Sequence, residues 1–198
     1  ENTPAASSNA VAELAIAHML ALSRNLLQGT ESIKDGEWIK SQLKGTELMG
    51  KTLGVIGIGR IGTLVSKKAT ALGMKILAFD KYISESPFDE VQMVELDFLL
   101  ENSDYITLHV PFVESEGAVI SDREFKKMKS NAYLINCARG GVVDEASLVE
   151  ALKNDRIAGA GLDVFQQEPP KKKELINSTN VTMTPHLGAS TFEAQNRV

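Results

Sequence analysis

Three polar side chains suited to acid–base chemistry and anion binding each follow an apolar run of the sequence. A histidine can exchange a proton near neutral pH, and a carboxylate beside it orients the ring and favours its protonated form. An arginine offers a planar, permanently charged fork of donors that matches a carboxylate. One such residue alone is usually a surface residue, so a site requires all three to converge. The three are Arg139 after the run 132–136, Glu168 after 158–164, and His186 after 181–184.

A glycine motif of the kind that binds nucleotide phosphates occupies residues 57–62. It follows an apolar run and opens an amphipathic pattern, and in this context G-x-G-x-x-G is a much stronger signal than it is alone. Gly57 would permit a tight turn, Gly59 would let the backbone approach a pyrophosphate, and Gly62 would let helix and strand pack closely. The amino end of the helix adds N–H groups and positive potential, and Arg60 adds a charge. A glycine-rich turn without a ligand is the alternative.

An acidic residue, Asp80, stands at the end of the next apolar run, 18 residues beyond Gly62. A carboxylate at that place can accept hydrogen bonds from the hydroxyls of an adenosine ribose, and it would repel a 2′-phosphate. Lys81 would offset part of that repulsion. The pattern therefore favours NAD over NADP, with a simple turn cap at Asp80 as the alternative.

The apolar patterns predict how these groups are held. Short runs that are apolar on both faces alternate with segments of helical spacing, which is typical of an α/β fold with a parallel sheet covered by helices on both sides. In such a doubly wound sheet, ligands bind at the carboxyl ends of the strands, so one crevice could hold all the groups named above. The predicted strands are 52–56, 75–79, 91–94, 105–110, 132–136, 158–164 and 181–184, and the predicted helices are 61–72, 95–101, 122–128 and 145–153.

The first fifty residues show a different pattern. Apolar residues at three- and four-residue spacing predict an amphipathic helix over 8–27, outside the repeating units of the sheet. His18 lies on its apolar stripe, where packing or an interface is favoured over catalysis. Residues 28–50 are polar and predict a loop-rich segment. A polar helical pattern over 190–198 has no closing glycine or proline, so we expect the chain to be an excised domain.

Composition argues against several classes of function. The chain has 198 residues, of which 43% are hydrophobic and 24% charged, as expected for a globular domain with a sizeable core. A net charge of −5 and a pI near 5.3 argue against nucleic-acid or anionic-membrane binding, and the basic run 171–173 is predicted to be a solvated loop. The single cysteine, Cys137, favours a cytoplasmic location. No run approaches ~18 apolar residues, so no membrane span is expected.

Four strings of the sequence carry a family resemblance. They are GIGRIG at 57–62, NCARGGVVDE at 136–145, LDVFQQEP at 162–169 and PHLGAST at 185–191. In this order they resemble the signatures of the D-2-hydroxyacid dehydrogenases, over essentially the whole chain. The resemblance implies an NAD-binding Rossmann fold over 1–198 that begins with an interdomain or dimerisation helix, with the family's separate substrate-binding domain absent. One departure is that members place threonines near Glu116 and Gly117.

The resemblance implies roles for the three polar residues. His186 would be the general acid in carbonyl reduction and the general base in alcohol oxidation, with Glu168 paired to it. Arg139 would bind the substrate carboxylate and polarise the reacting carbonyl. A hydride would pass between substrate C2 and the nicotinamide ring of NAD.

Residues implied to contact NAD extend along the same edge. Asp163 matches a family aspartate near the nicotinamide carboxamide, and His109 would line the adenine and ribose side without a catalytic role. Cys137 is predicted to be a small buried residue rather than a nucleophile. No metal is implied. The implied cofactor-binding residues are Gly57, Gly59, Arg60, Ile61, Gly62, Asp80, His109, Val110, Pro111, Cys137, Ala138, Arg139, Asp163, His186 and Gly188.

The ending 187–195 is most similar to the 3-phosphoglycerate dehydrogenases of this family. The resemblance therefore implies NAD-dependent oxidation of D-3-phosphoglycerate, a phosphorylated 2-hydroxy acid, to 3-phosphohydroxypyruvate, the first step of serine biosynthesis, by a homodimer or larger homo-oligomer. Two alternatives stay open: another member such as a glyoxylate or hydroxypyruvate reductase, and a non-enzymatic NAD-sensing protein of the corepressor type. Because the substrate-binding domain normally closes over the substrate, we expect this chain alone to bind cofactor with little or no turnover.

Overall fold

Seven parallel strands form a single sheet in the computed structural model, which describes residues 4–196. Their order is β3-β2-β1-β4-β5-β6-β7, so the chain builds outwards from β1 to β3, returns to pair β4 with β1, and builds outwards again to β7. This topology confirms the predicted doubly wound fold, whose crevice opens between β1 and β4. The strands are β1 (Thr52–Ile56), β2 (Lys75–Phe79), β3 (Val91–Met93), β4 (Tyr105–Leu108), β5 (Tyr133–Asn136), β6 (Gly159–Leu162) and β7 (Val181–Met183).

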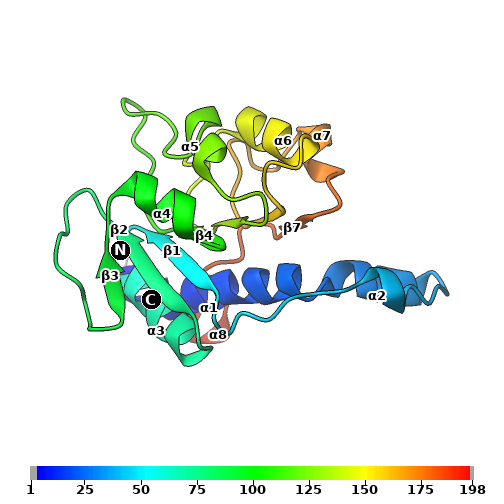
Figure 1. Cartoon of the computed structure of the whole chain (residues 1–198), viewed down its shortest axis with the longest axis horizontal. Coiled ribbons are helices and arrows are strands. Elements are labelled where there is room, and N and C mark those ends of the chain that lie inside the picture. The colour runs from blue at the N-terminus through cyan, green and yellow to red at the C-terminus, as the bar shows by residue number, and fades with distance from the viewer. Residues whose placement is uncertain (1–3, 197–198) are drawn as a thin grey trace.

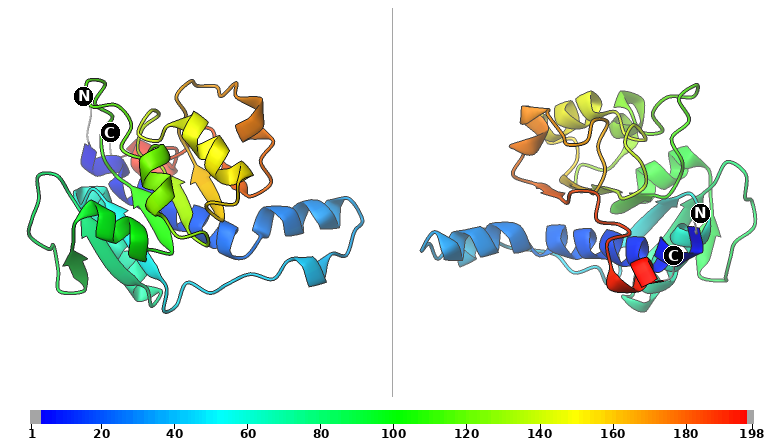
Figure 2. Two further views of the ribbon diagram at one scale, coloured as in Figure 1. Left: turned by 45° about the horizontal axis from the view of Figure 1, so that its top comes forward. Right: turned by 180° about the vertical axis from the view of Figure 1, so that it is seen from behind.

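Helices cover both faces of the sheet (Figures 1 and 2). On one face, α1 packs against α3, α8 and the strands β5, β6 and β7, while α4, α5 and α6 lie on the other face. The α2 helix extends away from the body of the domain in every view. The helices are α1 (Pro4–Ser23), α2 (Leu26–Lys34), α3 (Arg60–Ala71), α4 (Leu96–Asn102), α5 (Asp122–Lys127), α6 (Glu145–Lys153), α7 (Lys173–Ile176) and α8 (Phe192–Asn196), with a 3₁₀ turn at Lys40–Gln42.

Each face of the sheet has its own apolar core. Leu53 and Val55 of β1 pack beneath α1 and α3, and Leu134 of β5 packs beneath the opposite helices. Full burial of one such side chain contributes about 1.5–3 kcal/mol. All residues of β4 and β6 are buried because helices cover both of their faces, and this explains the uninterrupted apolar runs in the sequence.

Capping side chains fix the starts of the two helices that follow β4 and β5. Ser121 and Glu124 form a reciprocal capping box at α5, in which Glu124 Oε2 accepts from the Ser121 N–H at 2.9 Å. Asp144 Oδ1 accepts from the Ser147 N–H at 2.7 Å at the start of α6. Each cap contributes about 1 kcal/mol. The second cap ends the loop that carries Arg139, so it also helps to hold that loop.

The N-terminal segment differs from the prediction in three ways. The helix predicted over 8–27 ends at Ser23, because Asn25 adopts a left-handed backbone with φ 52°, and a new helix begins at Leu26. The segment predicted to be loop-rich, 28–50, contains most of α2 and the 3₁₀ turn. The first helix does not lie outside the layers of the sheet but covers one of its faces. Residues 28–34 contain a single large apolar side chain, Ile33, so apolar spacing does not indicate a helix there.

Smaller differences lie near the C-terminus. The basic run predicted to be a loop leads directly into α7, which begins at Lys173 and was not predicted. The polar helical pattern over 190–198 corresponds to α8, and its last two positions, 197 and 198, lie outside the described residues. Among residues 4–196, no single helix has the length and apolar composition needed to cross a membrane, and Ser7–Ser23 and Leu26–Lys34 reach that standard only as a pair bent by 63°.

Candidate active site

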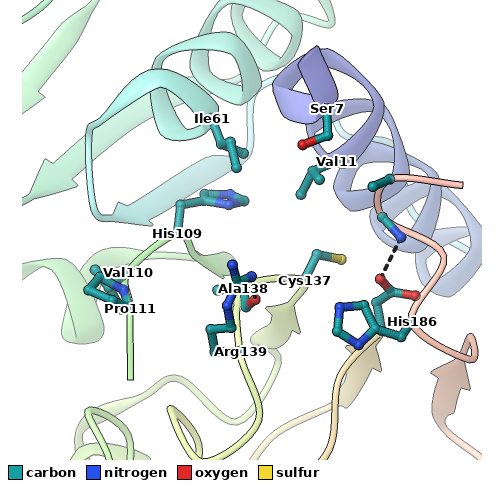
Figure 3. A pocket seen from close by; sticks show the side chains of 13 residues that line it. Ser7, Val11, Ile61, His109, Val110, Pro111, Cys137, Ala138, Arg139 and His186 are labelled. Carbon is teal, nitrogen blue, oxygen red and sulfur yellow. Dashed lines mark hydrogen bonds between the residues drawn. The ribbon is translucent and has the colours of Figure 1, made fainter. Parts of the chain in front are cut away.

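A cavity of about 560 Å³ opens at the carboxyl edge of the sheet, where the loops after β4, β5, β6 and β7 meet α1 and the first turn of α3 (Figure 3). The structure therefore brings most of the residues singled out from the sequence to one cavity. Those that line it are Ile61, His109, Val110, Pro111, Cys137, Ala138, Arg139, Asp163, His186 and Gly188.

The glycine motif forms the turn between β1 and α3 beside this cavity. Gly57 has a φ of +93°, which a side chain would strain, and a Cβ at Gly62 would lie 2.0 Å from the carbonyl oxygen of Gly57. A Cβ at Gly59, by contrast, would have no heavy atom within 4 Å. Gly57 and Gly62 are therefore required by the turn itself, whereas the space beside Gly59 is open and leaves room for a phosphate. Arg60 is the first residue of α3 and is exposed.

Asp80 lies beside this turn, as predicted. Its Oδ2 accepts a hydrogen bond from the Ile58 N–H at 2.9 Å, and its Oδ1 accepts from the N–H groups of Tyr82 and Ile83 at 2.9 and 3.1 Å. The carboxylate thus caps the turn after β2 and ties it to the glycine motif. Because a carboxylate has about four acceptor positions, these bonds leave capacity for a ribose hydroxyl.

Lys81 forms an ion pair with Glu116. Its Nζ lies 2.7 Å from Glu116 Oε1, and this hydrogen bond raises the pKa of Lys81. Glu116 is one of the two positions that depart from the family pattern, and it supplies this lysine with a partner. A lysine paired in this way is less available to offset the repulsion between Asp80 and a 2′-phosphate.

His186 and Glu168 form a close pair. His186 Nδ1 lies 2.7 Å from Glu168 Oε2, and Glu168 Oε1 accepts from the Phe165 N–H at 3.2 Å. The hydrogen bond from His186, together with the one from Phe165, lowers the pKa of Glu168. Because an ionised carboxylate only accepts, Nδ1 carries the proton of this bond and Nε2 is left to exchange a proton. The Gln166 N–H also donates to Glu145 Oε1 at 2.7 Å, which ties the Glu168 loop to α6.

Arg139 presents a free cation at the cavity wall. Asn136 shapes its loop by accepting from the Ala138 N–H at 3.0 Å and donating to the Arg139 carbonyl at 3.1 Å. Arg139 Nη1 donates to the Ala138 carbonyl at 2.6 Å. Within residues 4–196, no carboxylate lies within ion-pair distance of its guanidinium, so most of its donors can serve an anionic ligand.

Asp163 organises the loop that carries His186. It is 1% exposed, and its two carboxylate oxygens accept three hydrogen bonds. Oδ1 accepts from the Thr184 hydroxyl at 2.6 Å and the Leu187 N–H at 2.7 Å, and Oδ2 accepts from the Gly188 N–H at 2.9 Å, the bond dashed in Figure 3. The sequence placed Asp163 at the cavity but gave no sign of this network.

His109 and Cys137 line the cavity as electrically neutral groups. His109 Nε2 lies 2.9 Å from Thr107 Oγ1, while its fully covered Nδ1 has no partner among the described residues. Burial lowers the pKa of His109 to about 3, so the ring stays neutral near pH 7. Burial, and then the nearby Asp163 carboxylate, raise the pKa of the Cys137 thiol, which makes it a poor nucleophile.

Three further residues line the cavity without having been predicted. Ser7 and Val11 come from α1, and Ala189 follows Gly188. Ala189 lies inside a matched string and could have been included, but the α1 residues become visible only when that helix is placed on the sheet. In the described part of the chain, no group of three or more His, Cys, Asp or Glu side chains could hold a metal ion.

Residues 16–188 match the family model described as the D-isomer specific 2-hydroxyacid dehydrogenase, NAD binding domain. This chain belongs to that family. A hydroxypyruvate reductase of Thermotoga maritima is 48% identical over 200 residues, covering 100% of this chain and 65% of the relative. A D-3-phosphoglycerate dehydrogenase of Methanocaldococcus jannaschii is 50% identical over 197 residues, covering 98% of this chain and 38% of the relative. The chain thus spans less than two thirds of the length of these dehydrogenases.

A solved structure of the family agrees with the fold. The D-lactate dehydrogenase of Aquifex aeolicus, complexed with NAD and lactic acid, aligns with a TM-score of 0.90 at 35% identity, over 98% of this chain and 64% of that chain. The predicted D-2-hydroxyacid dehydrogenase resemblance and NAD as the cofactor are confirmed. The cavity fits a dinucleotide, because it lies beside the turn at Gly59, where a Cβ would meet no heavy atom within 4 Å.

Proposed function

We propose that these 198 residues are the NAD-binding domain of a longer dehydrogenase that oxidises D-3-phosphoglycerate to 3-phosphohydroxypyruvate. The observation that carries the proposal is the 2.7 Å pair of His186 and Glu168 at the cavity that Arg139 also lines. An acid–base group, its orienting carboxylate and an uncommitted cation are the parts required to oxidise an α-hydroxy acid.

In the proposed reaction, His186 Nε2 accepts the proton of the substrate hydroxyl during oxidation and returns it to the carbonyl oxygen during reduction. Glu168 keeps the ring oriented and stabilises the charge that the ring gains. Arg139 binds the substrate carboxylate, which brings C2 close to the imidazole. NAD, when bound, supplies the hydride-transfer chemistry.

Different residues of the chain are proposed to bind different parts of NAD. We assign the pyrophosphate to the turn 57–62, where backbone N–H groups at the start of α3 and the Arg60 charge favour an anion. Asp80 is assigned to the adenosine ribose. His109, Val110 and Pro111 would contact the adenosine side, and Cys137, Ala138, Asp163 and Gly188 the nicotinamide side.

The substrate is tested in the full-length enzyme. We expect kcat/KM for D-3-phosphoglycerate to exceed that for D-glycerate by at least about 100-fold, because a site built for a polar group rejects an analogue that lacks it. D-Glycerate is the matched control, since it differs only in the phosphate. The alternative is a hydroxypyruvate reductase, as the 48% identical relative is named. Faster reduction of hydroxypyruvate than of its phosphorylated form would select that alternative.

We further propose that two copies associate through the segment 24–45, here called the α2 arm. The arm is closed at its base by the hydrogen bond from the Thr46 N–H to the Ser23 carbonyl at 2.9 Å, and it extends from the body in Figures 1 and 2. Its exposed apolar side chains include Leu26, Ile33 and Trp38. Large apolar side chains exposed on one projecting segment support an interaction site there.

The arm is tested by sedimentation of the chain at micromolar concentration. We expect a dimer for the parent and a monomer when Ile33→Glu and Trp38→Ser are combined, since charge and lost contact area both oppose association. Tyr82→Ser is the matched control, because Tyr82 is 81% exposed and Trp38 80%, and Tyr82 lies in the loop after β2, outside the arm. A parent that stays monomeric refutes the arm as an interface.

The free, buried Cys137 leads us to propose a cytoplasmic location as well.

A further inference from the structure

A buried chain of hydrogen bonds connects α1 to the loop that carries His186. It begins at His18, which is 4% exposed on the face of α1 that packs on the sheet. His18 Nδ1 lies 2.6 Å from Thr182 Oγ1, and Nε2 lies 3.1 Å from Thr184 Oγ1. Thr184 in turn donates to Asp163 Oδ1 at 2.6 Å. The chemistry proposed above uses neither His18 nor the two threonines.

Asp163, at the end of this series of hydrogen bonds, determines which group donates in each of them. An ionised Asp163 can only accept, so Thr184 must give its single hydroxyl proton to Oδ1. The Thr184 oxygen then accepts from His18 Nε2, which makes Nε2–H the protonated ring nitrogen. His18 Nδ1 is consequently an acceptor, and Thr182 donates to it. A neutral ring with one defined tautomer satisfies all four groups.

Asp163, at the end of the hydrogen-bond series, holds the backbone of the proposed catalytic loop. The Asp163 carbonyl accepts from the His186 N–H at 2.9 Å, while its carboxylate holds the N–H groups of Leu187 and Gly188. His186 has a φ of 54°, a left-handed conformation that surrounding bonds must maintain. A rotation of the Asp163 carboxylate would therefore move the backbone of Leu187 and Gly188, the two residues that follow His186.

At the other end of the hydrogen-bond series, close packing of α1 on the sheet fixes the position of His18. A Cβ at Gly161 of β6 would lie 2.8 Å from His18 Cβ, so only glycine allows α1 to come this close. Such contact leaves the imidazole little freedom to shift along the strand. Thr184 is therefore fixed from one side by a ring anchored on α1 and from the other by Asp163.

Burial of the His18 ring costs desolvation free energy. Burial lowers the pKa of His18, and the Asp163 charge opposes this only in part, so the ring is neutral near pH 7. An apolar side chain would fill the same space without the desolvation cost. The ring's two bonds to the threonines are what distinguish it from an apolar side chain.

We propose that His18 is a positioning residue for catalysis, which acts through the Thr184 hydroxyl to orient Asp163 and hence the backbone of the His186 loop. The proposal rests on the proposed function in one respect only, the catalytic role of His186. The effect on loop order is independent of that role.

The test compares His18→Leu with His18→Gln, and Thr184→Val with Thr184→Ser. One readout is hydrogen exchange of the Leu187 and Gly188 amides in this chain, and the other is kcat and KM of the full-length enzyme. We expect Thr184→Val and His18→Leu to speed exchange of both amides about fivefold, the effect of losing one hydrogen bond. We expect kcat to fall about tenfold with KM for NAD little changed, because the reacting groups are misplaced while the dinucleotide turn is intact.

The conservative variants keep a donor or hydroxyl at the same place, so Thr184→Ser and His18→Gln should regain most of the parental exchange protection and kcat. Thr182→Val is the matched control, because it removes the other hydroxyl that bonds the His18 ring but leaves the Thr184 bond to Asp163. Unchanged exchange at both amides in His18→Leu, alongside faster exchange in Thr184→Val, overturns the role of His18. A parental enzyme without turnover would refute the proposed function alone, and the exchange data would still decide the inference.

Discussion

Replacing His186 by asparagine should lower kcat of the full-length enzyme by about 10²- to 10⁴-fold, which is the usual contribution of a general acid–base group. Asparagine is the informative substitution, because His186 has a φ of 54° and asparagine tolerates that conformation better than most residues. The loss then reports the missing imidazole and not a displaced loop. The measurement is steady-state oxidation at saturating NAD, with NADH affinity by fluorescence as the check on binding.

The second cavity histidine supplies the control for that experiment. His109 also lines the cavity, but burial lowers its pKa to about 3, so the ring stays neutral and does not take up a proton near neutral pH. We expect His109→Asn to reduce kcat less than about tenfold at saturating cofactor, well short of the acid–base range. Equal losses in the two variants would mean that His186 is not the acid–base group.

Replacing Gly59 by valine should weaken NADH binding by about 10- to 100-fold and leave the folded state intact. A Cβ at Gly59 meets no heavy atom within 4 Å, so the stability change should stay within about 0.5 kcal/mol. The added side chain instead fills the space proposed for the pyrophosphate, at an overpacking cost of about 1–3 kcal/mol in the complex. The measurements are thermal unfolding of the chain and NADH titration.

Two comparisons sharpen this second prediction. Gly62→Val should lower both stability and affinity, because its Cβ would lie 2.0 Å from the Gly57 carbonyl oxygen. Asp80→Ala should weaken NADH about tenfold, as expected on losing a charge-assisted hydrogen bond, and should narrow the preference over NADPH. If Gly59→Val and Asp80→Ala both bind NADH like the parent, the site is elsewhere.

The regular units of the fold were predictable because their signals are local. β1, β2 and α6 begin and end at the predicted residues, since each is an apolar or amphipathic run bounded by turn or capping residues. β4 is shorter than its predicted run, which extended over 105–110. The last two positions, His109 and Val110, lie beyond the end of the strand and line the cavity. Pattern alone does not show where a strand stops pairing and starts contacting a ligand site.

The site was predictable as a set of positions but not as a network. Topology places the ends of parallel strands at one edge, and this rule brought Arg139 and His186 to one cavity from widely separated parts of the sequence. The contributions of Ser7 and Val11 were not predictable, because they depend on which face of α1 meets the sheet. The bonds of Asp163 to the loop after β7 depend on the direction of its side chain across two separate loops, which no spacing rule encodes.

The two outermost strands, β3 and β7, contain only three residues each. Unpaired backbone groups at a sheet edge are templates for another chain to add as a strand, and short edge strands limit the number of bonds such an addition can make. Each edge of the sheet therefore offers few backbone hydrogen bonds for amyloid-like addition of further strands. The proposed recognition of a second copy by the α2 arm and the protection against uncontrolled polymerisation thus involve different parts of the molecule.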